Sequence, residues 1–197
     1  MTTATWRDAT PDPSPADAAL FPPIRVRSDY ERERNRATIA ALSRASYGRA
    51  FQPGCSRGEL TAQLARRCVQ VVATDRLPRF VASTQQRCAQ FLNVEVHQAG
   101  LTEGLPPGTF DLIVLSDFGG YFQPASLIQI VMQMVGRLQL GGEILAAHSL
   151  IPAGDRLLYG DAVHYLLGAR LPLDCIHSER HDEFRIDLWK RVPPNTI

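Results

Sequence analysis

The feature that most constrains the fold is a short apolar segment that runs into a turn of small residues and then into a helical pattern. The turn, residues 53–58, has the sequence Pro-Gly-Cys-Ser-Arg-Gly, and the helix-forming run 59–65 follows at once. The small side chains of Gly54, Ser56 and Gly58 let a ligand approach the backbone, and a helix N-terminus offers N–H groups without intrahelical partners. The order strand, turn, helix therefore predicts a ligand-binding turn.

An acidic residue follows at the spacing typical of a nucleoside-binding site. The second apolar run, residues 69–74, ends in Asp75. An acid at the tip of the second strand, about 20 residues past the turn, usually binds ribose hydroxyls. Turn and acid together predict a nucleoside cofactor at the carboxyl ends of a parallel sheet. A purely structural strand-to-helix turn is the alternative, because Ser56 occupies the second glycine position of a G-x-G-x-G pattern.

The composition narrows the class of protein. With 197 residues, 45% of them hydrophobic and 21% charged, the chain is long enough for one well-buried globular domain. A net charge of +1 gives no reason to expect a nucleic-acid or membrane partner. The cysteines form no C-x-x-C pair, so we expect no metal site and no disulfide framework. The N-terminus lacks an apolar run of signal length, which favours a cytoplasmic protein.

The N-terminal part divides into an arm and the start of a domain. Residues 1–27 are rich in proline and are expected to form a flexible arm, whereas residues 28–197 are expected to form a single domain. Ser28 or Asp29 is expected to start a helix that continues to Leu42. This helix could lie over the cofactor site, and a solvated charged face is the alternative.

The rest of the chain alternates between strand and helix patterns. Strands are predicted at 69–74, 94–98, 110–116, 143–148, 171–180 and 183–191, and helices at 59–67, 79–91, 124–138 and 160–167. The pair Gly141-Gly142 is expected to stop the third of these helices. This order predicts an α/β fold with a doubly wound, mostly parallel sheet. The last two strands are expected to pair as a C-terminal antiparallel hairpin.

Several motifs together resemble the class I S-adenosylmethionine (SAM) methyltransferases, and within them the nodulation protein S (NodS)-like family. The run FQPGCSRGELT is similar to that group's F-E-P-G-C-S-x-G-x-L-T, and FDLIVLSDFGGYF is similar to F-D-L-I-V-x-S-E-V-G-Y-Y. Shorter likenesses, to S-x-Y-E, G-G-x-L-x-x-x-H and G-D-x-V-H, fall at residues 28–31, 141–148 and 160–164. The resemblance extends from about residue 28 to residue 191 and implies a Rossmann-like fold with SAM as cofactor.

The resemblance also implies a reaction. The NodS-like group is expected to methylate an amino-sugar nitrogen in a lipo-chitooligosaccharide type of acceptor. An amine or hydroxyl of another small metabolite is an equal alternative, and the oligomeric state is open. A second class of function is a SAM-binding module that has lost its catalytic activity. A nicotinamide enzyme is disfavoured, because the turn lacks G-x-G-x-x-G spacing.

This chain departs from the family pattern at five positions. Gln52 stands where the family has an acid, and Gly100 stands where many class I enzymes have an aspartate that binds the adenine amino group. Asp117 replaces a glutamate, Gly120 replaces a tyrosine, and Ser149 replaces a tryptophan. These changes predict an altered acceptor site, weaker cofactor binding, or both.

The resemblance assigns roles to individual residues. Backbone groups of the turn are expected to hold the amino-acid end of SAM, Asp75 the ribose, and Arg76 with the turn at Gly100 the adenine; Arg34 could reach the SAM carboxylate. The residues expected to bind the cofactor are Tyr30, Arg34, Gln52, Gly54, Ser56, Gly58, Asp75, Arg76, Gly100, Leu101 and Ser116.

Four residues are candidates for catalysis. Asp117, at the tip of the fourth strand, is expected to attract and orient a protonated amine. His148 and His164 are the candidate general bases, because an imidazole titrates near neutral pH. Tyr121 could close over the substrate. The alternatives are helix capping by Asp117, structural hydrogen bonds for the two histidines, and simple packing for Tyr121.

Overall fold

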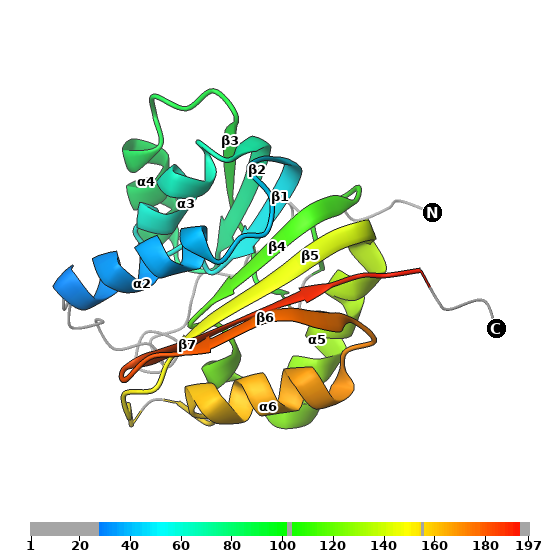
Figure 1. The fold of residues 1–197 in the computed structure, drawn as a ribbon. Helices are drawn as coiled ribbons and strands as arrows, with labels where there is room; N and C mark the ends of the chain where they lie inside the picture. The colour runs from blue at the N-terminus through cyan, green and yellow to red at the C-terminus, as the bar shows by residue number, and fades with distance from the viewer. Residues whose placement is uncertain (1–27, 102–103, 155, 194–197) are drawn as a thin grey trace, which may run out of the picture.

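The computed structural model describes residues 28–101, 104–154 and 156–193, so the expected arm at residues 1–27 lies outside the described residues. A seven-stranded sheet in the order β3-β2-β1-β4-β5-β7-β6 forms the centre (Figure 1). The strands are β1 (Tyr47–Pro53), β2 (Cys68–Asp75), β3 (Val94–Gln98), β4 (Phe110–Ser116), β5 (Leu138–Ser149), β6 (Asp174–Arg180) and β7 (Phe184–Lys190). The first five are parallel and β7 is antiparallel to both neighbours, which confirms the predicted doubly wound fold with its C-terminal hairpin.

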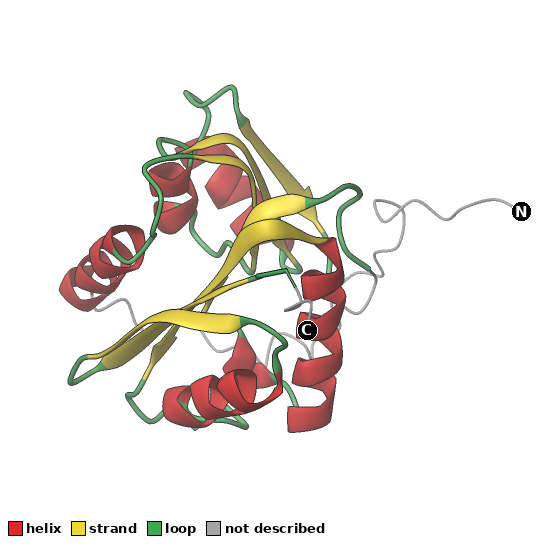
Figure 2. Ribbon diagram, turned by 45° about the vertical axis from the view of Figure 1, so that its right-hand side comes forward, coloured by secondary structure: helices red, strands yellow, loops and turns green. Residues whose placement is uncertain are grey.

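Helices cover both faces of the sheet (Figure 2). They are α2 (Ser28–Ala40), α3 (Glu59–Leu64), α4 (Pro78–Arg87), α5 (Pro124–Arg137), α6 (Gly160–Arg170) and the short 3₁₀ helix η2 (Gly119–Tyr121). Alternate residues of β4 enter two hydrophobic cores, as a strand requires. Ile113 and Leu115 belong to the core under α5 and α6, whereas Leu112 and Val114 belong to the core under α2 and α3. None of the described helices combines the length and the apolar character that a membrane span needs.

The change of helix layer occurs between β1 and β4, next to the centre of the sheet. The helices that follow β1 and β2 lie on one face, and those that follow β4 and β5 lie on the other (Figure 1). In an open parallel sheet, ligands bind at the carboxyl ends of the strands where the connections diverge. The fold therefore places its binding edge after β1, β2, β4 and β5.

The end of α5 differs from the sequence prediction. The helix was expected to reach residue 138 and stop at Gly141-Gly142, but it ends at Arg137, and Leu138 already pairs with Phe110 in the sheet. A distant residue accounts for this end: the Arg191 guanidinium donates to the carbonyl of Val135 at 3.3 Å. The turn at Gly141 instead lies within β5, where the register with β4 shifts.

The C-terminal hairpin also has an order that the strand patterns did not reveal. The last strand, β7, lies between β5 and β6, so it is covered by neighbours on both sides. Both of its faces are buried: Ile186 packs in one core and Trp189 in the other. The smaller differences are at helix ends, where α2, α3 and α4 stop two to four residues early and α6 runs on to Arg170.

Candidate active site

The turn after β1 has a left-handed backbone at three positions. Gly54, Ser56 and Gly58 have φ values of 67°, 50° and 80°. A Cβ on Gly58 would lie 2.9 Å from the Cα of Thr84, so this glycine is needed for packing against α4. A Cβ on Gly54 would meet nothing within 4 Å, which leaves that side of the turn open to a ligand. The turn thus separates a packing side from a binding side.

Asp75 lies directly beside this turn. Its carboxylate accepts hydrogen bonds from the amide of Ser56 and the amide of Leu77, each at 3.0 Å. Burial raises the pKa of Asp75, and these two amides oppose that shift. A carboxylate has about four lone-pair sites, so the bonds from backbone amides leave acceptor capacity for a ligand's hydroxyl group. The residues present therefore fit the ribose of a nucleoside cofactor.

Gln52 has a hydrogen-bond partner within the fold. Its side chain is buried, and its Oε1 accepts a hydrogen bond from the Thr61 hydroxyl at 2.8 Å. This bond joins β1 to α3. The side-chain carbonyl of Gln52 thus has a structural partner. The expected contact of Gln52 with the cofactor stays a prediction.

The expected adenine-side residues gather at the ends of β2 and β3. Arg76 directly follows Asp75, and its backbone carbonyl accepts a hydrogen bond from the side-chain Nε2 of Gln98 at 3.3 Å. Gly100 is buried, and Leu101 is half-buried against the core under α5 and α6. These positions border the same edge as the turn, so backbone groups and Leu101 are available to an adenine ring.

Helix α2 brings Tyr30 and Arg34 to the opposite part of the edge. The Tyr30 hydroxyl donates to the carbonyl of Glu183 at 3.4 Å, and the Arg34 guanidinium lies 5.4 Å from the centre of the Tyr30 ring. Arg34 is buried and forms an ion pair with Asp117. The two residues do share one face, as the helical spacing predicts.

Asp117 joins three segments at the tip of β4, where Ser116 is half-buried. It adopts a left-handed backbone with φ of 49°. One carboxylate oxygen accepts from the amide of Ser149 at 2.8 Å and lies 3.4 Å from the Arg156 guanidinium, while the other pairs with Arg34. Two guanidinium groups therefore compensate this carboxylate. That arrangement does not fit the expected attraction of a protonated amine by Asp117.

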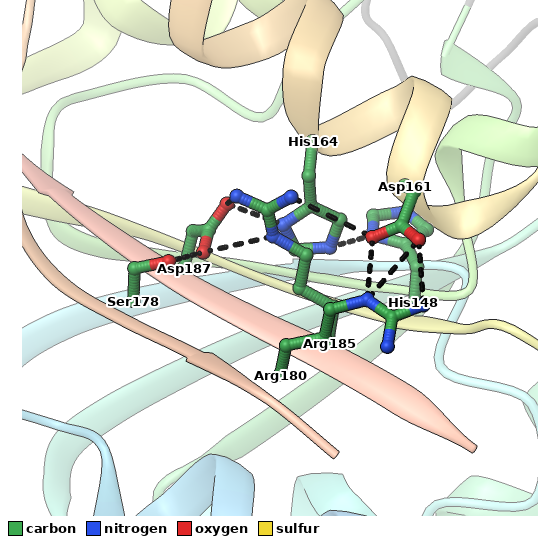
Figure 3. Close-up of polar contacts among 7 residues, drawn as sticks. All are labelled: His148, Asp161, His164, Ser178, Arg180, Arg185 and Asp187. Atoms are coloured by element: carbon green, nitrogen blue, oxygen red, sulfur yellow. Dashed lines mark hydrogen bonds and ion pairs between the residues drawn. The ribbon is translucent and has the colours of Figure 1, made fainter. Parts of the chain in front are cut away.

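The two candidate bases form a buried chain of hydrogen bonds (Figure 3). The Gly119 amide donates to Nε2 of His148 at 3.0 Å, Nδ1 of His148 lies 3.1 Å from Nε2 of His164, and Nδ1 of His164 lies 2.8 Å from Asp187. Since the amide donates to His148, the hydrogen bonds assign the ring proton of each histidine to Nδ1. Ser178 donates to the second oxygen of Asp187 at 2.6 Å.

The surroundings of His148 favour its uncharged form. Burial, the neighbouring His164 and the guanidinium groups of Arg156 and Arg34 hold the pKa of His148 well below its usual range. Burial alone would raise the pKa of Asp187, but the hydrogen bonds from His164 and Ser178 outweigh it and lower the pKa. All four ring nitrogens are engaged. The expected general-base role does not fit this geometry, which instead ties the loop after β4 to α6 and β7.

The structure adds two residues that the sequence patterns missed. Arg156 lies between β5 and α6, and its guanidinium is 6.0 Å from the ring centre of the half-buried Tyr121. No periodic pattern marks that connection. Asp187 lies in the alternating strand β7, and the buried Trp189 two positions on shows that the Asp187 face is covered too. The sequence signal that could have identified Asp187 is an acidic residue between two apolar positions of a strand. Among the described residues, no cluster of side chains could hold a metal ion.

Known proteins share this fold and these motifs. A family described as a methyltransferase domain matches residues 51–142. Nodulation protein S of Sinorhizobium fredii (strain NBRC 101917 / NGR234) is 27% identical over 167 residues, which cover 76% of this chain and 77% of that protein. A crystal structure of a candidate methyltransferase from Pseudomonas syringae is 38% identical, with a TM-score of 0.73, and the match covers 82% of this chain and 99% of that one.

A lower-identity match supports the fold. The N-methyltransferase NodS from Bradyrhizobium japonicum WM9, in complex with S-adenosyl-L-homocysteine, superimposes with a TM-score of 0.75 at 20% identity, over 86% of this chain and 91% of that one. Fold, turn and sequence likeness agree on one class. The chain belongs to the class I SAM-dependent methyltransferases, and SAM is its cofactor. Within that class it is similar to nodulation protein S over most of its length.

Proposed function

We propose that this methyltransferase acts on an amine or hydroxyl group of a small-molecule acceptor, and that amino sugars are the first acceptors to test. The main support for a SAM site is the turn at residues 54–58 beside the Asp75 carboxylate. The amino-sugar class comes from the likeness to nodulation protein S and to the N-methyltransferase NodS.

The cofactor-binding roles follow from position along the edge. Backbone amides of the turn hold the amino-acid end of SAM, and Asp75 accepts hydrogen bonds from the ribose hydroxyls. Arg76 and the turn at Gly100 border the adenine. Arg34, whose Nε has no hydrogen-bond partner among the described residues, binds the SAM carboxylate.

The acceptor side lies around Ser116, Asp117 and Tyr121, where β4 ends. SAM, when bound, supplies a methyl group on a sulfonium for in-line displacement. An amine that arrives uncharged forms the new N–C bond with its own lone pair while the C–S bond breaks, and the methylated product then releases its proton to water. No histidine base is needed for that step, so the site chiefly aligns the nucleophile.

The proposal is tested by methyl transfer from isotope-labelled SAM to glucosamine, chitosan oligomers and a set of small amines and alcohols, with product identified by mass spectrometry. We expect a methylated product from at least one acceptor class, on nitrogen or on oxygen. Binding of S-adenosylhomocysteine without any methylated acceptor would argue against this substrate range.

A further inference from the structure

The connection between β5 and α6 lies against the loop that follows β4. The amides of Leu157 and Leu158 donate to the carbonyl of Gly120 at 2.7 and 3.1 Å. A Cβ on Gly120 would lie 3.0 Å from the carbonyl oxygen of Leu158 and 3.2 Å from the Cδ of Arg156. Gly120 stands where the resembled family has a tyrosine. The glycine therefore provides the space into which the Arg156 side chain fits.

The charges at this place do not balance. Among the described residues, Arg34 and Arg156 place two guanidinium groups against the single carboxylate of Asp117. The side chains of both arginines are mostly covered, with exposed fractions of 9% and 14%. The Nε atoms of both are buried without a hydrogen-bond partner in the described part of the chain. Buried cations without full compensation are unfavourable, so the cluster has capacity for a further anion.

In the proposed binding mode, the carboxylate of SAM goes to Arg34 and leaves Arg156 without a new partner. SAM carries a sulfonium and an ammonium against one carboxylate, so its binding adds positive charge to the edge. Its carboxylate is assigned to Arg34 on α2, whereas Arg156 approaches from the other side, beside Tyr121 and the tip of β4. That side is the one proposed above for the acceptor, around Ser116, Asp117 and Tyr121.

We propose that Arg156 binds an anionic group of the methyl acceptor, a carboxylate or a phosphate, and thereby selects the acceptor. This inference rests on the proposed function, since it names the substrate class of the same site. A guanidinium group recognises both oxyanions through forked hydrogen bonds, which Lys cannot reproduce. An amino sugar that carries a phosphate or an acid group fits both this inference and the likeness to NodS.

The test observes the arginine Nε–H signals by proton–nitrogen NMR in the full chain saturated with S-adenosylhomocysteine. Loss of a signal in Arg156→Gln assigns Arg156, and the exposed Arg170→Gln serves as the control variant. Benzoate, phenyl phosphate and the neutral benzamide are then titrated as probes. Benzoate and phenyl phosphate distinguish a carboxylate site from a phosphate site, and benzamide reports binding of the ring alone.

We expect a saturable shift of the Arg156 signal with at least one anion and none with benzamide. Arg156→Gln should weaken binding of that anion about 10- to 100-fold, as loss of a charged hydrogen bond does. Both Arg156→Gln and Arg170→Gln should bind S-adenosylhomocysteine with the wild-type affinity. The inference is overturned if neither anion shifts the signal, if benzamide shifts it equally, or if Arg156→Gln binds the anion as tightly as wild type.

Failure of the proposed function would look different, because the methyl-transfer assay would then give no methylated amine or hydroxyl acceptor, whether or not an anion shifts the Arg156 signal. Should Arg156→Gln not fold, Arg156→Lys gives a second variant that keeps the charge and loses the fork. We expect it to bind S-adenosylhomocysteine normally and the anion more weakly. Equal anion affinity in a folded Arg156→Lys would contradict forked recognition, and the wild-type titration decides whether the anion binds there at all.

Discussion

The two halves of the binding edge are built by different means. At β1 and β2, the half proposed to bind the cofactor (the cofactor half) consists of a left-handed turn and one carboxylate, and Asp75 accepts hydrogen bonds from the backbone amides of Ser56 and Leu77. At β4, β5 and β7, the half proposed to bind the acceptor (the acceptor half) consists of charged and imidazole side chains. Its central pair, Arg34 and Asp117, joins residues 83 positions apart.

This difference shows which half can change its specificity. Backbone amides depend little on side-chain identity, so the cofactor half tolerates Ser56 in a glycine position. The acceptor half depends on individual side chains, and single replacements alter its charge. Gly120, at a position where the resembled family has a tyrosine, leaves room for the Arg156 side chain. The cofactor site is therefore expected to be conventional and the acceptor site particular to this chain.

The largest expected effect lies in the cofactor half. Asp75→Ala removes the proposed acceptor of the ribose hydroxyl bonds, and each charged hydrogen bond contributes about 1.5 to 3 kcal/mol. We expect the affinity for S-adenosylhomocysteine to fall by roughly 100-fold or more, as measured by titration calorimetry. The exposed Asp174→Ala should bind as wild type does. Equal affinity of Asp75→Ala and wild type would remove the ribose assignment.

The two glycines of the turn separate packing from binding. Gly58→Ala places a Cβ against the Thr84 backbone at φ of 80°, and we expect it to lower the free energy of unfolding by about 2 to 4 kcal/mol. Gly54→Ala has open space, so its cost should be about 1 to 2 kcal/mol from the left-handed backbone alone. Urea denaturation measures both; equal costs would mean that the packing side of the turn is misassigned.

Asp117→Asn is expected to disturb the acceptor half and spare the cofactor half. The amide oxygen can keep the bond from Ser149, but both guanidinium groups lose their counter-charge. We expect a loss of about 1 to 3 kcal/mol in unfolding free energy, less than for a fully buried pair because Asp117 is partly exposed. Calorimetry should show S-adenosylhomocysteine binding reduced less than in Asp75→Ala. An equal reduction would mean that the two halves are not independent.

The smallest expected effect is a pH dependence from His148. The pKa of His148 is lowered in the folded protein, so below about pH 6.5 the unfolded chain takes up a proton that the folded chain does not. Stability is therefore lost as the pH falls below that value, with a slope of up to about 1.4 kcal/mol per pH unit. His148→Gln should flatten the slope of unfolding free energy between about pH 5 and 6.5. The exposed His177→Gln should not, and an unchanged slope in His148→Gln would contradict the buried neutral histidine.

The positions of some strands and of the turn could be predicted from the sequence because residues nearby in the chain determine them. The apolar runs predicted β3 and β4 at the bounds that the structure has, Val94–Gln98 and Phe110–Ser116. The turn at 53–58 and the position of Asp75 followed from small residues and spacing. Helix ends were less readable: α5 stops at Arg137 because Leu138 joins the sheet and Arg191 caps the helix from the far end of the chain.

The sequence by itself determined the class of this protein, because it carries the patterns of a parallel sheet, a glycine-rich turn and an acid at the end of the next strand. Only the tertiary structure decided what His148, His164 and Asp117 contact, and that Arg156 joins them. A histidine at a strand end looks the same in a sequence whether it faces solvent or Gly119 and His164. Burial and partners depend on segments far apart in the chain, and they decide whether a titratable group is a base, a tether or a binding charge.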